Sequence, residues 1–378
     1  MSTDPRLSRR SALKTVGAAG AVAMLGKSAS SAATAASEPP QQASDLRQRI
    51  FSKVWGTPFI DTHEHLCDEH DRLPPDGAHR GADDWTVVLA GYLGSDLRSA
   101  GMPGDVHGRF CAKGVPAVEK WKLLEPYWPA VKNTAYGQAA RISLRQLYGI
   151  DELSAASVEK AQTGYEQTRQ PGFYRRVLCE LSNIESCQVN CMNPPFLESR
   201  MPTLMMQDLS IVGMFAGPNL ALFGKRTGIS VNALGDWHKV IDWWFTKYGR
   251  YAVAVKSQDA YRRDIDYTQT PSEQAAESFA KVIKGEPVDP RDQKSLEDHL
   301  FWYAVQKATE HDLPVKLHTG YYAGQNGMPL SRLAKNAGSA CELCRTSPQT
   351  SFVFMHICYP YYEELLAVAK HWTNAFVD

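Results

Sequence analysis

Two histidines separated by one residue follow a short apolar run near the start of the chain. In "FIDTHEHL" (residues 59–66), His63 and His65 occupy positions i and i+2. Side chains alternate between the two faces of a strand, so both imidazoles would project from the same face. Paired imidazoles are typical ligands of Zn, Mn, Fe or Ni. The alternative for either histidine alone is a polar residue at the mouth of a loop.

Polar residues also end three later strand-like runs: Lys256 in "YAVAVKSQ" (251–258), His318 in "PVKLHTG" (314–320) and His356 in "SFVFMHICYP" (351–360). In a barrel the carboxyl ends of the strands converge on one mouth, so we expect these residues to meet His63 and His65 there. A single histidine is more often a satisfied core or loop residue, whereas four at strand ends favour a metal site. A catalytic site of this kind keeps one position open for water or substrate.

The elements that must position these residues alternate along the chain. Apolar runs predict strands that begin near residues 59, 184, 209, 251, 314, 351 and 374. Apolar residues at helical spacing predict helices over 236–249, 296–313, 330–346 and 361–372. This alternation indicates a parallel α/β sheet covered by helices, and the polar strand ends favour a (β/α)8 TIM-like barrel over a doubly wound sheet. Residues 67–183 are expected to form a mostly helical insertion after the first strand.

Three of these motifs, "DTHEHL", "VKLHTG" and "FMHICYP", resemble the signatures of strands one, five and six in the amidohydrolase superfamily. The resemblance runs from about residue 47 to the end of the chain. It is strongest to the branch that holds amidohydrolase-2 type decarboxylases and hydrolases and uronate isomerase. The segments "AVAVKSQDAYRRDIDY" and "LHTGYYAG" are similar to the amidohydrolase-like half of nodulin/glutamine-synthetase fusion proteins.

The resemblance implies roles for the residues at the strand ends. His63 and His65 would be metal ligands, and His318 would be a third ligand or lie beside the metal. His356 would orient the substrate or shuttle protons. Lys256 matches a lysine that is carbamylated between two metals in binuclear members, but in this branch contact with substrate is the favoured role. We therefore expect one divalent ion rather than two, with zinc preferred and manganese or iron as alternatives.

Two residues after Lys256 are candidates for substrate binding. Tyr261 and Arg262 lie on the loop that follows the fourth predicted strand, and the Arg262 guanidinium could hold a substrate carboxylate in bidentate fashion. The alternative for Arg262 is a salt bridge with Asp264 or Asp266.

One feature of the superfamily has no counterpart in the sequence. Family members carry an aspartate at the end of strand eight, where it binds metal and takes a proton from the attacking water. Asp378, the last residue, ends the seventh predicted strand and matches a non-catalytic position. We therefore expect strand eight to be missing and the sequence to be a C-terminal truncation, a fragment of a longer protein. A natural seven-stranded protein is the alternative.

These observations predict an enzyme, a metal-dependent hydrolase in which a metal-activated water attacks a C–N or C–O bond of a small, carboxylate-bearing substrate. A decarboxylase or a uronate-isomerase-like sugar-acid isomerase would use the same metal site. An exported binding protein without catalysis is the third hypothesis. The sequence lacks the GxGxxG and GxSxG motifs of dinucleotide enzymes and serine hydrolases.

The N-terminus indicates export. "SRRSALK" (8–14) precedes a short apolar run and then "SASSAATAAS". A charged region, an apolar region and a small-residue exit are typical of a signal peptide that is too short to span a bilayer. The Arg9-Arg10 pair is similar to a twin-arginine signal, although Ala12 stands where a large apolar residue is usual. We expect residues 1–36 to be this signal, 37–46 a linker and 47–378 the barrel, located in the periplasm.

The balance of charged residues indicates which classes of binding partner are expected. Lysine plus arginine equals aspartate plus glutamate, at 41 each, so electrostatic capture of nucleic acid is not expected. The expected partner is a small-molecule substrate, without a stable membrane span, and homo-oligomerisation is left open. Cys341 and Cys344, in "CELC", are expected to lie on a helix as structural thiols or as one disulfide.

Overall fold

The computed structural model describes residues 40–73, 84–89, 91–191, 193–215, 223–323 and 329–378. The chain divides into two units, residues 1–54 and 55–378. The predicted signal, residues 1–36, lies outside the described residues.

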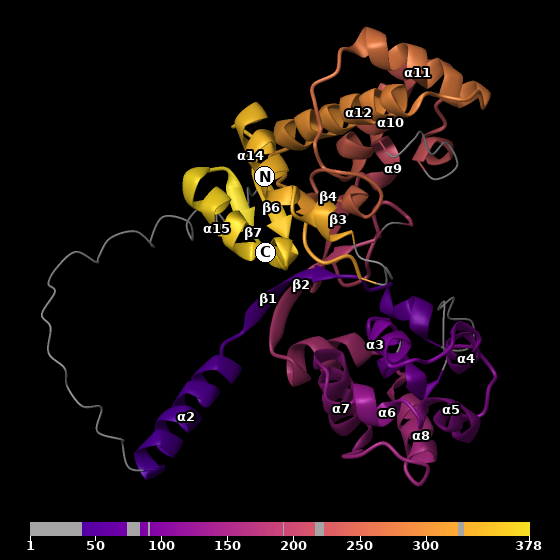
Figure 1. Cartoon of the computed structure of the whole chain (residues 1–378), viewed down its shortest axis with the longest axis vertical. Helices are drawn as coiled ribbons and strands as arrows, with labels where there is room; N and C mark the ends of the chain where they lie inside the picture. The colour runs from indigo at the N-terminus through magenta and orange to yellow at the C-terminus, as the bar shows by residue number, and fades with distance from the viewer. Residues whose placement is uncertain (1–39, 74–83, 90, 192, 216–222, 324–328) are drawn as a thin grey trace, which may run out of the picture. The chain divides into compact units, whose positions relative to one another are not determined.

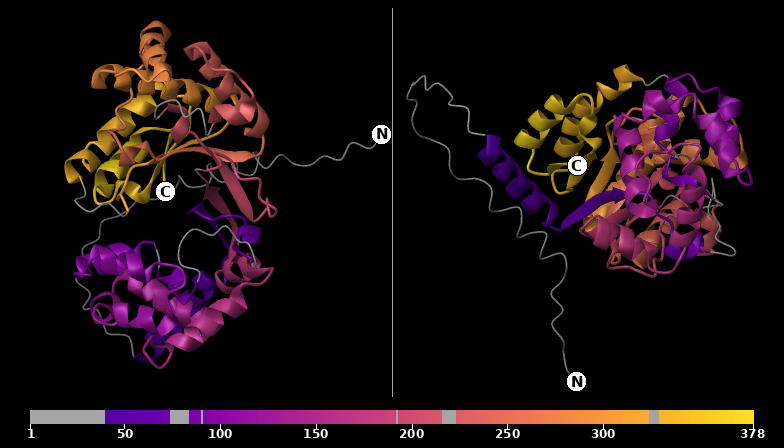
Figure 2. Two further views of the ribbon diagram at one scale, coloured as in Figure 1. Left: turned by 90° about the vertical axis from the view of Figure 1, so that its right-hand side faces the viewer. Right: turned by 90° about the horizontal axis from the view of Figure 1, so that it is seen from below.

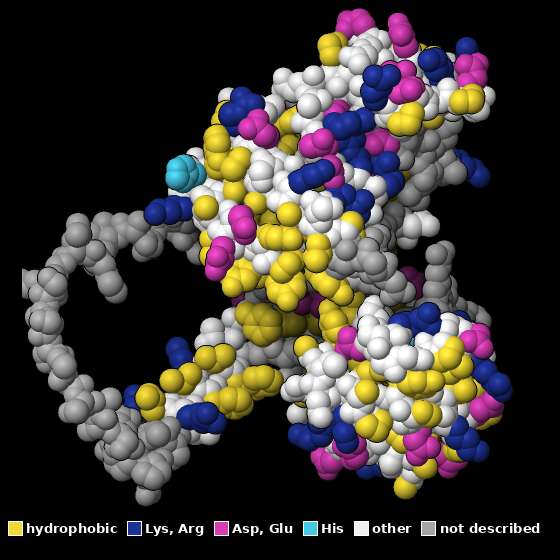
Figure 3. Space-filling model, in the orientation of Figure 1, with side chains coloured by type: hydrophobic (Ala, Val, Ile, Leu, Met, Phe, Trp, Pro, Cys, Tyr) yellow, Lys and Arg dark blue, Asp and Glu magenta, His cyan; other side chains and the backbone are white. Residues whose placement is uncertain are grey.

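Helix α2 (Pro40–Trp55) includes residues 40–46 of the segment predicted to be a linker, so that part of the segment is helical. Its sequence contains three Gln, two Arg, one Ala, one Leu and one Lys, which favour a helix, and proline is tolerated in the first turn. The helix exposes apolar side chains, among them Leu46, Ile50 and Val54 (Figure 3).

Seven parallel strands form one sheet whose spatial order is the chain order (Figure 1). They are β1 (Phe59–Glu64), β2 (Ile184–Asn190), β3 (Met205–Ser210), β4 (Ala252–Ser257), β5 (Val315–His318), β6 (Phe352–Met355) and β7 (Ala375–Val377). The Lys316 ammonium donates to the Thr62 carbonyl oxygen at 2.9 Å, and the Thr62 hydroxyl donates to the Asp378 carboxylate. These bonds link β1 to β5 and to the end of β7, so the sheet is curled like a large part of a barrel. The predicted parallel α/β fold is confirmed, with seven of the eight strands of a TIM-like barrel.

The third strand is the main error in the predicted strand positions. We expected it near residue 209, but β3 begins at Met205, and residues 212–215 form the short helix α9 (Val212–Phe215). The strand contains Gln207 and Asp208, which are buried, so it lacks the continuous apolar character used to find the others. The other strands begin within one residue of their predicted positions.

Helices α10, α12, α14 and α15 pack against one side of the sheet, and α11 packs on α10 and α12 (Figures 1 and 2). The helices after β3 are α10 (Leu234–Tyr248), α11 (Ser272–Lys284), α12 (Pro290–Glu310), α13 (Leu330–Leu333), α14 (Asn336–Thr346) and α15 (Tyr362–His371). Along β5 the side chains alternate: Val315 and Leu317 join the core shared with these helices, whereas Lys316 and His318 are polar. This alternation places the polar side chains on the inner face of the curled sheet. The helical position of "CELC" in α14 is confirmed, and all eight cysteines of the chain are free thiols.

Between β1 and β2 the described residues form helices. They are η1 (Glu69–Arg72), η2 (Trp85–Val88), α3 (Leu93–Ser99), α4 (Gly104–Phe110), α5 (Ala117–Leu124), α6 (Trp128–Val131), α7 (Ala135–Tyr148), α8 (Val158–Thr168) and the π-helical segment η3 (Arg175–Leu181). Their apolar faces form a core of their own that includes Trp85, Trp121 and Trp128. Lys120 and Asp84 form a buried ion pair within these described residues. The insertion therefore has the packing of a small helical domain.

Charged side chains of both signs are interspersed over α11 and α12 on the face shown in Figure 3. Lys294 and Asp298, for example, pair at 2.7 Å on α12. Within the described part of the chain, every helix falls short of the length or the apolar content that crossing a bilayer requires.

Candidate active site

Four histidines from three strands of the sheet come together at its carboxyl edge. The ring centroids of His63 and His65 are 4.6 Å apart, and those of His63 and His356 are 5.4 Å apart. His318, the last residue of β5, lies 4.4 Å from His356, which follows β6 directly. Parallel strands present their carboxyl ends to one edge of the sheet, which is why residues so distant in sequence meet here.

Burial keeps these imidazoles neutral. It lowers the pKa of His63 and that of His318 far below the usual value, and the nearby Lys256 ammonium lowers both further. Burial also lowers the pKa of His65, and it lowers that of His356 to about 4. At neutral pH the rings therefore carry free lone pairs, the form in which histidine binds metal or accepts a proton.

Lys256 lies at the centre of this electrostatic pattern. It is on β4, as predicted, and it is fully buried, with its ammonium nitrogen 2.6 Å from the Met355 sulfur. Burial lowers the pKa of Lys256 to about 7, although the carboxylates of Asp208 and Asp378 raise it. The side chain is therefore close to its protonation midpoint near neutral pH, which suits proton exchange with a substrate.

The ring nitrogens of these histidines are chemically suitable ligands for a divalent metal ion. Nδ1 of His65 lies 3.1 Å from the Asn190 carbonyl oxygen, a contact that orients the ring and leaves Nε2 for a metal. Nδ1 of His63 is buried and has no hydrogen-bond partner among the described residues, so a bound cation would satisfy it. Nε2 of His318 lies 2.9 Å from the Tyr321 carbonyl oxygen, which leaves Nδ1. As the side chains stand, no three His, Cys, Asp or Glu residues of the described chain are grouped closely enough to hold a metal ion.

The two residues predicted to bind substrate have different surroundings in the structure. The Tyr261 ring packs against His318, with centroids 4.5 Å apart, so it borders the histidine cluster. Arg262 is about half exposed and pairs with Asp259 at 3.1 Å and with Glu297 at 2.9 Å. The sequence predicted a salt bridge from Arg262 to Asp264 or Asp266 as the alternative. The choice of these two partners is wrong, because the partners are Asp259 and Glu297.

The adjacent arginine makes three further ion pairs. Arg263 pairs with Asp266 at 3.5 Å, with Glu297 at 3.1 Å and with Asp298 at 2.6 Å. Both neighbouring arginines contact Glu297 on α12, and sequence proximity alone could not tell which of the two would pair with Asp266.

Several buried polar residues of the site were not predicted from the sequence. Asp208 on β3 pairs with Lys316 on β5 at 3.0 Å, and both side chains are almost fully buried. The side-chain amide of Asn190 is buried without a partner among the described residues. The signal that could have found them is a polar residue inside an otherwise apolar strand, as in "MMQDLS" and "VKLH".

Asp378 directly follows β7, the position predicted for it. Its carbonyl oxygen accepts a hydrogen bond from the Ile357 amide at 2.9 Å, and its carboxylate accepts one from Thr62. The same carboxylate raises the pKa of His356, opposing the effect of burial. The last residue of the chain is thus part of the charge environment of the cluster.

Comparison with known proteins identifies the relatives of the chain. A family model described as Amidohydrolase matches residues 260–378. Protein fluG of Emericella nidulans is 32% identical over 136 residues, which are 33% of this chain and 15% of that protein. The chain therefore spans only a small part of this relative.

Solved structures share the fold. Uronate isomerase from Thermotoga maritima has a TM-score of 0.64 at 13% identity, covering 87% of this chain and 77% of that one. Glucuronate isomerase from Caulobacter crescentus has a TM-score of 0.64 at 15% identity, covering 90% and 77%. A protein from Lactobacillus casei, named as a metal-dependent hydrolase, has a TM-score of 0.53 at 15% identity, covering 86% and 74%. Residues 260–378 therefore match the amidohydrolase family, in agreement with the resemblance of the strand-end motifs, and most of the chain has the fold of the uronate isomerases.

Proposed function

We propose that the protein is a metal-dependent hydrolase acting on a small, carboxylate-bearing substrate at the carboxyl edge of the sheet. The observation that carries the proposal is the convergence of four neutral histidines from β1, β5 and β6 beside the buried Lys256. The match of residues 260–378 to the amidohydrolase family supports it.

His63, His65 and His318 would hold one divalent ion, zinc in the first instance. When bound, such an ion polarises a substrate oxygen and lowers the pKa of a water molecule toward neutrality. The orientation of His65 by the Asn190 carbonyl and the unsatisfied Nδ1 of His63 support this assignment. Side-chain rotations would be required to bring the three rings to one ion.

The remaining residues would handle the proton and the substrate. His356 is neutral, because its pKa is lowered to about 4, and it can accept a proton from a bound hydroxyl or water. Tyr261 would provide a wall of the substrate site through its contact with His318. Arg262 would hold a substrate carboxylate with the half of its side chain that is exposed, while Asp259 and Glu297 fix its orientation.

Sugar-acid isomerisation is the second candidate, supported by the two uronate isomerases among the structural neighbours. The same histidines would then position vicinal oxygens of a uronate, and His356 or Lys256 would move the proton. A decarboxylase on this site is the related alternative. A binding protein without turnover is the third candidate. Such a protein would bind metal and ligand but would not catalyse a reaction.

One assay separates these candidates. The purified protein, reconstituted with zinc, is incubated with panels of amides and esters of small carboxylic acids, with uronates, and with aromatic carboxylic acids. Release of acid and amine or alcohol supports the hydrolase. Aldose–ketose conversion without consumption of water establishes the isomerase instead, and CO2 release the decarboxylase. Zinc-dependent ligand binding with no turnover on any panel would contradict all three enzymatic candidates.

A further inference from the structure

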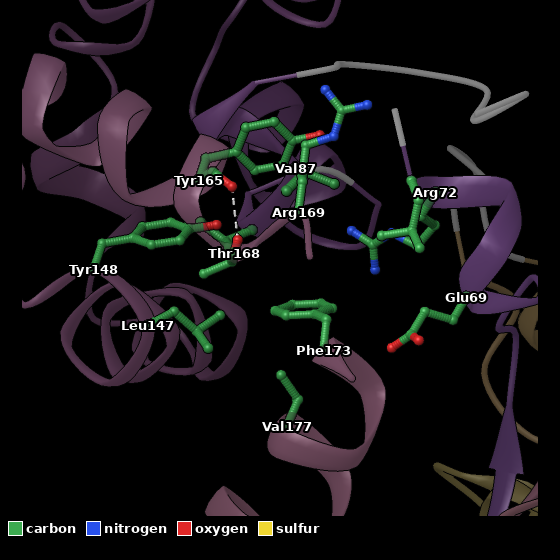
Figure 4. A pocket seen from close by; sticks show the side chains of 12 residues that line it. Glu69, Arg72, Val87, Leu147, Tyr148, Tyr165, Thr168, Arg169, Phe173 and Val177 are labelled. Atoms are coloured by element: carbon green, nitrogen blue, oxygen red, sulfur yellow. Dashed lines mark hydrogen bonds between the residues drawn. The ribbon is translucent and has the colours of Figure 1, made fainter. Parts of the chain in front are cut away.

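Two cavities of the described chain differ in the chemistry of their linings. One lies within the helical insertion, has a volume of about 210 Å³ and is bordered by side chains such as Phe173 and Val177 (Figure 4). Neither histidine nor cysteine is among the residues that line it. The other, of about 760 Å³, lies beside α12 and is bordered by His299 and Tyr303. The larger cavity therefore borders an imidazole, a group that binds transition metals.

His299 forms a close pair with a second histidine. It lies on α12, and His238 lies on α10, a helix that packs beside α12 (Figure 1). Nε2 of His238 is 3.0 Å from Nε2 of His299, and the ring centroids are 5.2 Å apart. The two nitrogens therefore face each other where the two helices meet.

A backbone carbonyl group fixes the tautomer of His299. Nδ1 of this ring lies 2.9 Å from the Thr270 carbonyl oxygen, which can only accept a hydrogen bond, so Nδ1 carries the proton. In the neutral ring Nε2 then presents a lone pair to His238. Carbonyl groups orient metal-binding histidines in the same way.

The ring of His238 is held by an aromatic neighbour. It stacks on Tyr303 with the centroids 4.0 Å apart and the planes 8° from parallel, and the Tyr303 hydroxyl contacts both Asp242 oxygens at 3.0 and 3.1 Å. Burial lowers the pKa of His238 to about 4, and the nearby His299 lowers it further, so the ring is neutral at neutral pH. Without an ion, a proton must lie between the two Nε2 atoms. A metal ion could replace that proton.

The separation of the two nitrogens indicates the kind of ion. Bonds from imidazole to a metal are about 2.0–2.1 Å long, so nitrogens 3.0 Å apart would subtend an angle of about 95° at a shared ion. Tetrahedral zinc would require nitrogens about 3.3 Å apart. Angles near 90° occur in square-planar and tetragonal coordination, which is typical of Ni²⁺ and Cu²⁺ with nitrogen and oxygen ligands.

The surroundings of the pair allow water and a cation to approach. Both histidines are partly exposed, and the larger cavity adjoins His299. The nearby ammonium of Lys307 pairs with Asp242 at 3.4 Å and with Glu310 at 2.9 Å. Two carboxylates thus offset the one ammonium, so a divalent ion would not meet uncompensated positive charge from this lysine.

From this geometry we propose that His238 and His299 form a metal site for Ni²⁺ or Cu²⁺, with water in the remaining coordination positions. The site joins α10 to α12 and uses none of the strand-end histidines, so it is independent of the proposed enzymatic function. Ions retained by proteins usually have three or four protein ligands. With two, this ion is expected to exchange with the buffer during purification.

The test is calorimetric titration with NiCl2. The parent protein and the His63→Ala/His65→Ala variant are titrated side by side, because the variant removes two of the strand-end ligands. In the variant we expect saturable binding of one Ni²⁺ per chain and no binding of MgCl2, since Mg²⁺ prefers oxygen ligands. Absence of saturable Ni²⁺ binding in the variant would overturn the proposal.

Further substitutions in both proteins locate the ion. His238→Gln and His299→Gln should each weaken Ni²⁺ binding by about tenfold or more, because a nitrogen ligand is lost. His371→Gln is the matched control, since it changes an exposed histidine of α15, and it should leave the affinity unchanged. The two ligands lie on different helices, so one variant decides the matter should the other fail to fold. Unchanged Ni²⁺ affinity in a folded Gln variant would overturn the proposal.

A hydrogen bond between the two rings is the competing explanation, and thermal unfolding separates it from a metal site. Excess NiCl2 should raise the melting temperature of the His63→Ala/His65→Ala variant, because an ion that binds only the folded protein stabilises it. The added substitution His299→Gln should reduce this rise. A lower melting temperature with an unchanged Ni²⁺-induced rise would show that the pair is only a hydrogen bond.

Discussion

Two lysines on the inner face of the sheet are buried to a similar degree but have different partners. Lys316 pairs with Asp208 at 3.0 Å and also donates to the Thr62 carbonyl oxygen. Lys256 contacts the Met355 sulfur, and burial lowers its pKa to about 7. The first lysine is therefore expected to stabilise the fold, and the second to serve the reaction at some cost in stability.

Replacing each lysine with methionine tests this difference. Lys316→Met leaves the Asp208 carboxylate buried and unpaired, so we expect a loss of about 3–5 kcal/mol in the free energy of unfolding. Lys256→Met removes a buried ammonium without stranding an ion pair, so it should lose turnover while unfolding at an unchanged or higher denaturant midpoint. Chemical denaturation and activity of both variants are the measurements. Equal destabilisation by both would show that Lys256 is as structural as Lys316.

At this scale the sequence predicted the histidines but not their polar neighbours. Histidines at the ends of apolar runs stand out, and the structure brings His63, His65, His318 and His356 together. Asp208 was missed because its pairing partner lies 108 residues away. Nothing in local spacing encodes such a contact.

At the scale of elements, the backbone after β6 is unusual. His356, Ile357 and Cys358 have φ values of 59°, 44° and 52°, a left-handed conformation that is unfavourable for residues with a Cβ, most of all for a β-branched one. This turn, η7 (His356–Cys358), directs the chain across the end of β5. A Cβ at Gly320 would lie 2.3 Å from the His356 carbonyl oxygen, so only glycine permits the approach.

Gly320→Ala should therefore displace His356. We expect a loss of about 1–3 kcal/mol in stability and a fall in turnover, because neither backbone can yield without moving the histidine. Gly338→Ala is the control, since Gly338 is exposed in α14 with open space around it, and there we expect a gain of about 0.5–1 kcal/mol. Thermal unfolding and activity of both variants are the measurements. Full activity in Gly320→Ala would contradict the positioning role of η7.

The elements also show what patterns could and could not predict. Strands β5 and β6 were placed within one residue because an apolar run, a histidine and a proline or glycine delimit each of them. The prediction for strand β3 was displaced because the buried polar residues Gln207 and Asp208 break its apolar run. Residues 37–46 were predicted to be a linker because Pro39, Pro40 and polar residues dominate the local composition, whereas the helix-forming residues of α2 follow directly after the two prolines.

At the scale of the whole molecule, the parallel sheet and its order followed from the alternation of strands and helices along the chain. The packing of the insertion did not, because helix–helix contacts between α3 and α8 depend on tertiary fit rather than on periodicity. Its separate core and cavity could be seen only in three dimensions.

Export is a proposal that also belongs to this scale. Residues 1–46 fused to a folded reporter should carry it out of the bacterial cytoplasm through the twin-arginine route. Replacing the pair with Arg9→Lys and Arg10→Lys should retain the reporter inside, because that route reads the paired guanidinium side chains. Cell fractionation measures the distribution. Equal export of both fusions would rule out the twin-arginine assignment.

The central claim of this account is that the histidines at the carboxyl edge of the sheet hold a metal ion. The most direct measurement is the metal content of the purified protein, by inductively coupled plasma mass spectrometry. We predict about one divalent ion per chain, lost in His63→Ala/His65→Ala and retained in His371→Ala, which changes an exposed histidine on α15. An undiminished metal content in the double variant would contradict the assignment of the site.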